Sequence, residues 1–234
     1  MRTLEQSVTS SYSTERSDRW ARLMALAGLV VFVVMTVLVE THALIGLDVA
    51  IMLAKSQAQS TLLLVWSQAV GVLLSAELSV IYTAIAVYVL IALGLRWWAL
   101  APTLWLPGTV VEAALKLTIH QPHIPPEYIL RSSFHLTNVD LPGSFPSGHA
   151  MRTAFLLLFI AIILWTRGGM LRRFMAAGML LISFAGGYAR VYMGYHWASD
   201  VVAGMALGFT LALLVAPQLS RMIVERGRAR TRPR

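Results

Sequence analysis

The stretch Trp20–Val39, WARLMALAGLVVFVVMTVLV, contains a single charged residue, Arg22. A helix needs about 20 mostly apolar residues to cross the hydrocarbon layer of a membrane, so this stretch predicts a spanning helix. Over the whole chain of 234 residues, 57% are apolar and 13% are charged. A water-soluble protein with this composition would be short of polar surface. The sequence therefore predicts an integral membrane protein.

Five further apolar runs follow, and together they predict an all-α protein, a polytopic membrane bundle of six transmembrane helices. We expect one membrane domain, residues 20–220, between an N-terminal tail, residues 1–19, and a basic tail, residues 221–234. Polar and charged residues interrupt the segment Thr41–Gln68, which predicts an interfacial helix with its loop rather than a seventh crossing. The six predicted helices are residues 20–39, 74–94, 97–118, 148–166, 172–189 and 197–217.

Lysine and arginine side chains gather in four clusters, which set the expected orientation because basic loops stay on the cytoplasmic side of a membrane. Six crossings place all four clusters and both termini in the cytoplasm. The loop Ile119–Ser147 and the turn Arg190–His196 then lie together on the extracytoplasmic face of the plasma membrane. The four clusters are Arg16–Arg22, Arg96, Arg167–Arg173 and Arg221–Arg234.

The composition of the two tails agrees with this orientation. Residues 1–19 are polar and lack a short apolar core followed by a cleavage site, so they predict a cytoplasmic tail rather than a removable signal peptide. The stretch Arg221–Arg234 has six arginines against one glutamate. In a soluble chain such a run would suggest nucleic acid, but beside a membrane helix it predicts attraction to anionic lipid headgroups. We therefore expect membrane lipids, and no nucleic acid, as partners.

The first candidate pair for chemistry is His196 with Asp200, at the start of the last predicted helix. Residues four apart share one helical face, so the carboxylate can accept a ring N–H of the histidine. This fixes the tautomer and leaves the other ring nitrogen free to attack phosphorus. Taken alone, the same pattern also suits a structural hydrogen bond between a loop and a helix.

The second candidate is the sequence FPSGH, Phe145–His149, which precedes the fourth predicted helix. Proline and serine before an apolar run are ordinary helix-start signals. Gly148 additionally lets backbone N–H groups approach an anion closely, and a helix N-terminus adds positive potential. The backbone around Ser147 and Gly148 is therefore predicted to hold phosphate, with His149 as a proton donor beside it.

Lys116 and Arg190 are the cations expected at the same face. Lys116 lies four residues after Glu112, so an ion pair between them is also expected. The planar guanidinium of Arg190 matches the spacing of phosphate oxygens. Both residues are predicted to bind phosphate.

No metal or other cofactor is expected. The chain has no cysteine, which excludes a cysteine nucleophile, a thiolate metal site and disulfides. Four histidines lack the accompanying carboxylate and histidine motif of a strong metal site, and the cations described above supply positive charge without a metal. These histidines are His120, His123, His149 and His196.

Together these groups resemble the type 2 phosphatidic acid phosphatase family, whose signature has the parts K-x6-R-P, P-S-G-H and S-R-x5-H-x3-D. The second part matches fully at Pro146–His149. The third part matches at its arginine, histidine and aspartate, but Ala189 stands in place of serine. In the first part Lys116 is present, whereas His123 and Ile124 occupy the arginine and proline positions.

The resemblance implies a six-helix membrane fold and a metal-independent phosphohydrolase acting on a lipid phosphate or a prenyl pyrophosphate. It implies that His196 forms a phosphohistidine, that Asp200 orients it and that His149 protonates the leaving group. The phosphate would be held by Lys116, Arg190, Ser147, Gly148 and, in place of the family's arginine, His123. Arg131 and Arg152 are further candidates to replace that arginine.

Two other functions remain open from the sequence. A phosphotransferase would pass the phosphoryl group from the same intermediate to another acceptor. A non-catalytic relative would bind or move phospholipids, and the altered first part of the signature is the reason to consider it. The sequence leaves open the lipid tail, the headgroup and the oligomeric state.

Overall fold

The computed structural model describes the backbone of residues 2–130 and 143–231 and the side chains of residues 18–130 and 143–226. Within these ranges the chain forms helices and no strand, which confirms the predicted all-α class. The α-helices are α1 (Arg2–Glu40), α2 (Ile45–Gln57), α3 (Thr61–Leu73), α4 (Ala76–Ala92), α5 (Trp105–Thr118), α6 (Gly148–Thr166), α7 (Met170–Tyr192) and α8 (Ala198–Thr231). Short 3₁₀ turns are formed by Arg96–Trp98, Ala101–Thr103 and Pro126–Tyr128.

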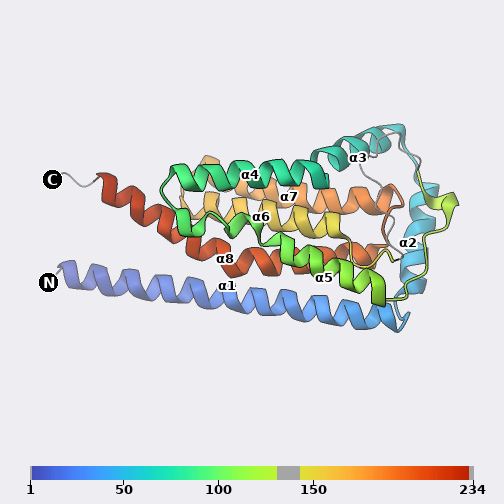
Figure 1. Ribbon diagram of the computed structural model, residues 1–234, viewed down its shortest axis with the longest axis horizontal. Helices are drawn as coiled ribbons and strands as arrows, with labels where there is room; N and C mark the ends of the chain where they lie inside the picture. Colours follow the sequence, from blue (N-terminus) through green and yellow to red (C-terminus); the bar gives the residue numbers. More distant parts are fainter. Residues whose placement is uncertain (1, 131–142, 232–234) are drawn as a thin grey trace.

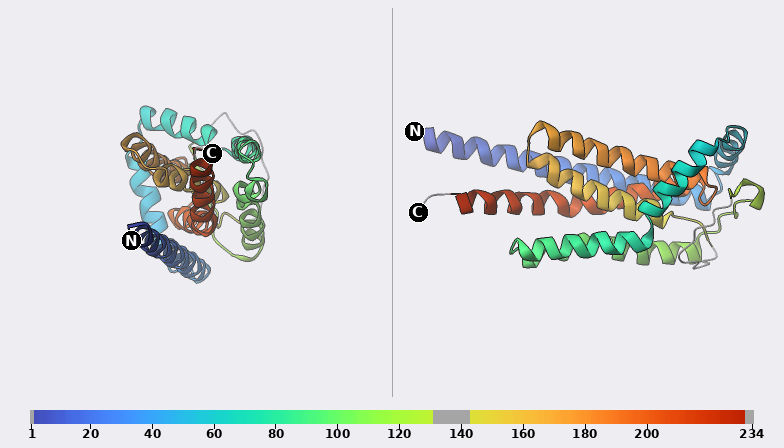
Figure 2. Two further views of the ribbon diagram at one scale, coloured as in Figure 1. Left: turned by 90° about the vertical axis from the view of Figure 1, so that its left-hand side faces the viewer. Right: turned by 90° about the horizontal axis from the view of Figure 1, so that it is seen from above.

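Helices α6 and α8 pack against each other at the centre of the bundle, with α1 along α8 and α7 along α6 (Figures 1 and 2). Their close approach depends on Gly204 and Gly208 of α8. A Cβ on Gly204 would overlap the carbonyl of Ser147, and a Cβ on Gly208 would overlap that of Met151. Small residues at a helix interface let two backbones approach in this way. The packing holds the first turns of α6 and α8 side by side.

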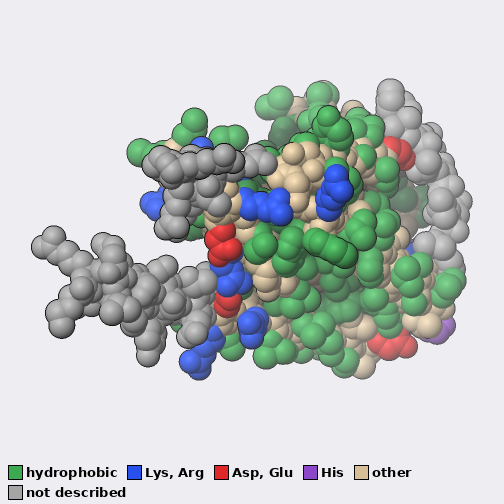
Figure 3. Space-filling model, turned by 60° about the vertical axis from the view of Figure 1, so that its left-hand side comes forward, with side chains coloured by type: hydrophobic (Ala, Val, Ile, Leu, Met, Phe, Trp, Pro, Cys, Tyr) green, Lys and Arg blue, Asp and Glu red, His purple; other side chains and the backbone are tan. Residues whose placement is uncertain are grey.

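Four helices are long and apolar enough to cross a membrane by length and composition, and a fifth span is possible if the bent pair α3 and α4 crosses as one unit. The bend between α3 and α4 is 45°. Apolar side chains cover the middle of the face drawn in Figure 3, as expected for helices that face lipid. The structure therefore supports a polytopic membrane bundle but does not confirm the predicted count of six spans. The four long spans are Asp18–Glu40, Gly148–Thr166, Met170–Tyr192 and Ala198–Arg226.

The predicted helix 97–118 is shorter in the structure, where α5 begins at Trp105. Two 3₁₀ turns precede it, and the second contains Pro102. A proline in the second turn of a helix removes a backbone hydrogen bond and clashes with the preceding turn, so a helix starting at residue 97 would be interrupted there. With 14 residues, α5 is too short to cross the hydrocarbon layer alone.

Within the described residues, the segments that carry the four basic clusters lie at one end of the bundle, where α1 starts and α8 ends (Figure 1). Arg221 forms an ion pair with Asp18 at 2.6 Å, which joins the C-terminal cluster to the cluster at the start of the first span. Arg226 donates a hydrogen bond to the carbonyl of Leu93 at 3.3 Å, close to Arg96. Thr166, next to the third cluster, contacts Ser220, next to the fourth. These contacts place basic residues of the clusters at the same end of the bundle, and the cytoplasmic location of that end stays a prediction.

The segment predicted to be interfacial contains α2 and the beginning of α3. Helix α2 runs across the end of the bundle opposite the termini, at a large angle to the spanning helices (Figure 1). Its apolar face packs against the start of α8, where Met52 is fully buried against Trp197 and Val201. The same helix buries Asp48 and Lys55. Helix α2 therefore covers the end of the bundle at which the predicted site residues gather.

Candidate active site

His196 lies in the turn between α7 and α8 and contacts the first turn of α8. Its Nδ1 lies 3.3 Å from Oδ2 of Asp200, whose side chain is completely buried. The backbone N–H of Trp197 donates to the same oxygen at 3.1 Å. A carboxylate only accepts hydrogen bonds, so Nδ1 of His196 is the donor and the lone pair of the neutral ring is on Nε2. The predicted pair therefore has the geometry of an oriented nucleophile.

The electrostatic surroundings of His196 favour the neutral ring. Burial lowers the pKa of His196, whereas the hydrogen bond and the negative charge of Asp200 raise it. The cations Lys116 and Arg190 are close enough to lower it further. A neutral imidazole is the form that can attack an electrophile, because the protonated ring has no free lone pair.

His149 lies in the first turn of α6 and is buried. Ser147 is the N-cap of that helix, and its hydroxyl accepts a hydrogen bond from the backbone N–H of Ala150 at 3.3 Å. Nη2 of Arg190 contacts Nδ1 of His149. A guanidinium only donates, so Nδ1 accepts and the neutral ring carries its proton on Nε2. That nitrogen has no hydrogen-bond partner within the described residues.

One backbone contact connects the two histidine-bearing segments directly. The N–H of Ser147 donates to the carbonyl of Asp200 at 3.0 Å. The FPSGH segment and the His196–Asp200 segment are therefore held in fixed register at the starts of two parallel, tightly packed helices. Both predicted catalytic histidines come from segments that this contact ties together.

An anion already lies at the N-terminus of α6, and it is the carboxylate of Glu112. The predicted ion pair is present, with 2.9 Å between Nζ of Lys116 and Oε1 of Glu112. Arg152, one turn after His149, approaches the other oxygen at 3.3 Å through Nη1. A Cβ on Gly148 would overlap this carboxylate, so the glycine makes room for it. The position beside Gly148 thus accommodates an oxyanion between two cations, as expected of a helix N-terminus.

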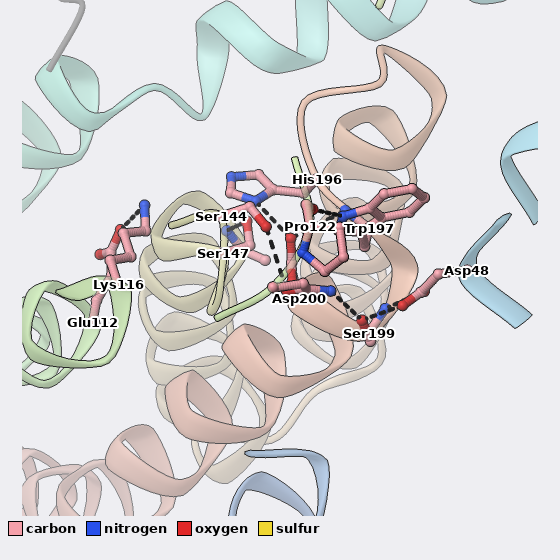
Figure 4. A network of polar contacts seen from close by, with 12 residues as sticks. Asp48, Glu112, Lys116, Pro122, Ser144, Ser147, His196, Trp197, Ser199 and Asp200 are labelled. Carbon is pink, nitrogen blue, oxygen red and sulfur yellow. Dashed lines mark hydrogen bonds and ion pairs between the residues drawn. The ribbon is translucent and has the colours of Figure 1, made fainter. Parts of the chain in front are cut away.

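His123 lies on the loop after α5, and its side chain is exposed. The preceding residue, Pro122, accepts a hydrogen bond at 2.8 Å from Nε1 of Trp197, so this loop is fastened beside the turn that carries His196 (Figure 4). Whether His123 binds phosphate stays a prediction. Arg131, the other loop candidate to replace the family's arginine, lies outside the described residues.

Within the described ranges, no cluster of three or more His, Asp or Glu side chains is arranged to hold a metal ion. His120, considered as a ligand from the sequence, is exposed and lies 3.9 Å from a carboxylate oxygen of Glu40. Apart from His120 and His123, the structure brings together the predicted site residues. They are Lys116, Ser147, Gly148, His149, Arg190, His196 and Asp200.

The sequence did not predict the contacts of Asp48, and it predicted only one of the two ion pairs of Glu112. Asp48 is 2% exposed and accepts hydrogen bonds from the backbone N–H of Ser199 at 3.0 Å and from its hydroxyl at 2.5 Å. The sequence signal for Asp48 is a carboxylate inside an apolar segment, which by itself predicts only an interruption of that segment. A buried charge is expensive, so its position in such a segment indicates a specific partner.

Comparisons with known proteins agree with this geometry. A family model described as the PAP2 superfamily matches residues 96–223. A phosphatidylglycerophosphatase B from Bacillus subtilis (strain 168) is 36% identical over 77 residues, which is 31% of this chain and 37% of that relative, so the match spans well under half of the relative's length. A crystal structure of a transmembrane PAP2-type phosphatidylglycerolphosphate phosphatase from Bacillus subtilis shares the fold, with a TM-score of 0.67 and 22% identity. That match covers 85% of this chain and 96% of the other.

Proposed function

This chain belongs to the PAP2 superfamily, and we propose that it is a membrane phosphohydrolase that removes a phosphate from a lipid phosphate or a prenyl pyrophosphate. The observation that carries this proposal is the oriented His196–Asp200 pair beside the buried His149–Arg190 pair at the N-terminus of α6. The name of the Bacillus subtilis relative, a phosphatidylglycerophosphatase, supports a lipid phosphate as substrate.

In the first step Nε2 of His196 attacks the phosphorus atom, and the bond between phosphorus and the leaving oxygen breaks. The product is a phosphohistidine, with the ring charge stabilised by Asp200. In the second step a water molecule attacks the phosphohistidine, free phosphate leaves and the neutral ring of His196 is restored. The backbone N–H of Gly148, together with the cations, stabilises the charge on the phosphate oxygens in both transition states, while the N–H of Ser147 remains bound to the carbonyl of Asp200.

His149 acts as the acid in the first step, and Arg190 links its protonation to phosphate binding. Without substrate, the guanidinium of Arg190 donates to Nδ1 of His149 and favours the neutral ring. A bound phosphate draws the guanidinium to its own oxygens and stabilises a positive charge nearby. His149 then takes up a proton at Nδ1 and gives the proton on Nε2 to the leaving oxygen.

Lys116 and Arg152 share Glu112 in the structure, and we propose that the substrate phosphate lies beside this carboxylate. Lys116 then contacts phosphate as well as Glu112. His123 is proposed as a further phosphate contact from the adjacent loop, in the place of the family's arginine. Because histidine loses its charge near neutral pH, this contact would be weaker than that of an arginine.

The direct test measures phosphate release by the purified full chain in lipid nanodiscs. The panel contains phosphatidylglycerol phosphate, phosphatidate and a prenyl pyrophosphate, and the readouts are free inorganic phosphate and the dephosphorylated lipid in equal amounts. Transfer of the phosphoryl group to an acceptor without free phosphate would establish a phosphotransferase instead. Binding of the lipids without any product would establish a non-catalytic relative.

We expect activity to be independent of divalent metal ions, because Lys116, Arg190 and the helix N-terminus supply the positive charge at the site. After incubation with excess EDTA and gel filtration, kcat on the preferred lipid should stay within about twofold of the untreated enzyme. The same preparation with a divalent ion added back is the control. Loss of turnover on chelation that a single divalent ion restores would contradict the proposal.

We propose that the site faces the extracytoplasmic side of the plasma membrane, because every basic cluster lies at the other end of the bundle. Since the chain has no cysteine, single cysteines report the topology directly. His120 is 85% exposed near the site, and Glu225 is exposed at the opposite end. In intact cells an impermeant maleimide should label His120→Cys and leave Glu225→Cys unlabelled until the cells are permeabilised. The reverse pattern would place the site in the cytoplasm.

A further inference from the structure

A chain of three side-chain hydrogen bonds crosses the site and ends on Asp48 (Figure 4). The hydroxyl of Ser144 donates to Oε1 of Gln121 at 3.3 Å. Nε2 of Gln121 donates to the hydroxyl of Ser199 at 3.2 Å. That hydroxyl donates its one proton to Oδ2 of Asp48 at 2.5 Å. Because a carboxylate only accepts, all three hydrogen bonds point toward Asp48 and strengthen one another.

This hydrogen-bond chain joins the three segments that carry the proposed catalytic machinery. Ser199 precedes Asp200 in the first turn of α8. Gln121 lies two residues before His123, in the loop that follows the helix of Lys116. Ser144 lies in the segment that leads into Ser147 and α6. A displacement of Asp48 therefore acts on all three segments, although the hydrogen bonds of Asp48 itself are with the start of α8.

Asp48 also fixes the backbone of α8. Its Oδ1 accepts the N–H of Ser199, the second residue of the helix, at 3.0 Å. The first N–H groups of a helix have no partner within the helix, and a carboxylate placed there satisfies one and interacts favourably with the helix dipole. Asp48 thus caps, from another helix, the turn that carries Asp200.

The free-energy cost of burying the carboxylate of Asp48 indicates that this residue has a specific role. Burial raises the pKa of Asp48, while hydrogen bonds from Ser199 and from the backbone of Ala198 lower it, so the contacts with the start of α8 stabilise the carboxylate. An apolar residue would fill the position on α2 without that cost, because the neighbours of Asp48 on this face pack in an apolar cluster with Met52. Helix α2 lies outside the region matched by the family model, residues 96–223.

We propose that Asp48 is a positioning residue, which holds the start of α8, the loop after α5 and the segment before α6 in the geometry that attack by His196 requires. It acts through Ser199 and contacts neither the nucleophile nor the proposed phosphate position. The expected kinetic effects of this proposal rest on the proposed function. The hydrogen bonds that join α2 to α8 do not depend on any activity.

The test is Asp48→Asn, which keeps the shape of the side chain and one acceptor for the N–H of Ser199. Its amide group donates where the carboxylate accepted, so the hydroxyl of Ser199 loses its acceptor and the hydrogen-bond chain loses its end point. We expect kcat on the preferred lipid phosphate to fall by about 10- to 100-fold, the size of effect produced by misplacing reacting groups by about an ångström. KM should change by no more than about twofold, because no proposed phosphate contact is removed.

Asp18→Asn is the matched control. It makes the same chemical change at the opposite end of the bundle, where Asp18 pairs with Arg221. We expect kcat of this variant to equal that of the wild type. Ser199→Ala removes the hydroxyl that joins Asp48 to Gln121. In that background Asp48→Asn should lower kcat by less than about threefold, because the connection is already broken.

Hydrogen exchange followed by mass spectrometry separates this proposal from the proposed function. In Asp48→Asn, amide exchange should become faster in peptides covering Trp197–Val201, and it should not change there in Asp18→Asn. If the wild type hydrolyses no lipid phosphate while this exchange pattern holds, the proposed function fails and the tie between α2 and α8 stands. Unchanged exchange at Trp197–Val201, an unchanged kcat per folded molecule, or effects of Asp48→Asn and Ser199→Ala that simply multiply would each overturn the positioning role.

Discussion

Replacing His196 with alanine is expected to lower kcat on a lipid phosphate by at least about 10³-fold while the protein stays folded. The attacking atom is Nε2 of His196, and the hydrogen bond to Asp200 at 3.3 Å fixes the ring so that this nitrogen carries the lone pair. In the proposed mechanism the other nearby histidine, His149, is protonated on both ring nitrogens when phosphate is bound, so it has no lone pair with which to replace the nucleophile. The rate is measured as release of inorganic phosphate. A melting temperature in detergent equal to that of the wild type shows that the variant is folded.

A covalent label gives the same prediction a second readout. When the wild type is mixed with a substrate carrying a radioactive phosphate and quenched in base, a fraction of the protein should retain label that is stable in base and lost in acid, as expected for phosphohistidine. His196→Ala should retain none. Turnover within tenfold of the wild type, or labelling of the variant equal to that of the wild type, would rule out His196 as the nucleophile.

The ends of the helices that border the site could be predicted closely because their signals are local. The apolar run predicted as residues 148–166 has the bounds of α6, since the proline and serine that precede it start the helix at Gly148. The last helix continues beyond the predicted end at residue 217, although Pro217 lies within it. A single proline removes one backbone hydrogen bond, and the helix on either side of it is long enough to continue.

The arrangement of polar residues within the site could be predicted only in part. Pairs four residues apart, such as His196 with Asp200, follow from helical periodicity alone. The contacts of Asp48 with Ser199 span 151 residues, and the contact of Arg152 with Glu112 spans 40. No periodic pattern relates residues so far apart, because their meeting depends on which helices pack together. Such contacts become visible only in the folded chain, and here they add Asp48 to the environment of the site and show that Arg152, a candidate from the sequence, pairs with Glu112.

Glu112 makes the ion pair expected from the sequence and further contacts beside Gly148. From the sequence it is a partner that lowers the cost of burying Lys116, and that pair is present. In the structure the same carboxylate also meets Arg152 and lies against Gly148, at the position where the helix N-terminus favours an anion. Two cations therefore share one carboxylate beside the proposed phosphate position. When a doubly charged phosphate binds there, both cations are already oriented, which lowers the free-energy cost of arranging them.

Replacing His149 with alanine is expected to produce a loss that depends on the leaving group of the substrate. An alkyl oxygen leaves poorly unless it is protonated, and loss of a positioned acid lowers such rates by about 10²- to 10⁴-fold. A p-nitrophenolate leaves readily without a proton, so its departure should need His149 much less.

The rate of the first turnover isolates this effect, because it reports formation of the phosphohistidine alone. Steady turnover also includes cleavage of the intermediate by water, which His149 is close enough to His196 to assist. In His149→Ala, formation of the phosphohistidine from an alkyl lipid phosphate should slow by about 10²- to 10⁴-fold. Formation from p-nitrophenyl phosphate should slow by less than about tenfold, seen as a burst of p-nitrophenolate before slow steady turnover. Lys116→Gln serves as the comparison, since a phosphate-binding lysine that does not contact His149 stabilises both substrates in the same way, and its loss should slow both by a similar factor. Equal slowing of the two substrates in His149→Ala would mean that His149 binds the phosphate rather than protonating the leaving group, and the acid would then have to be sought elsewhere in the site.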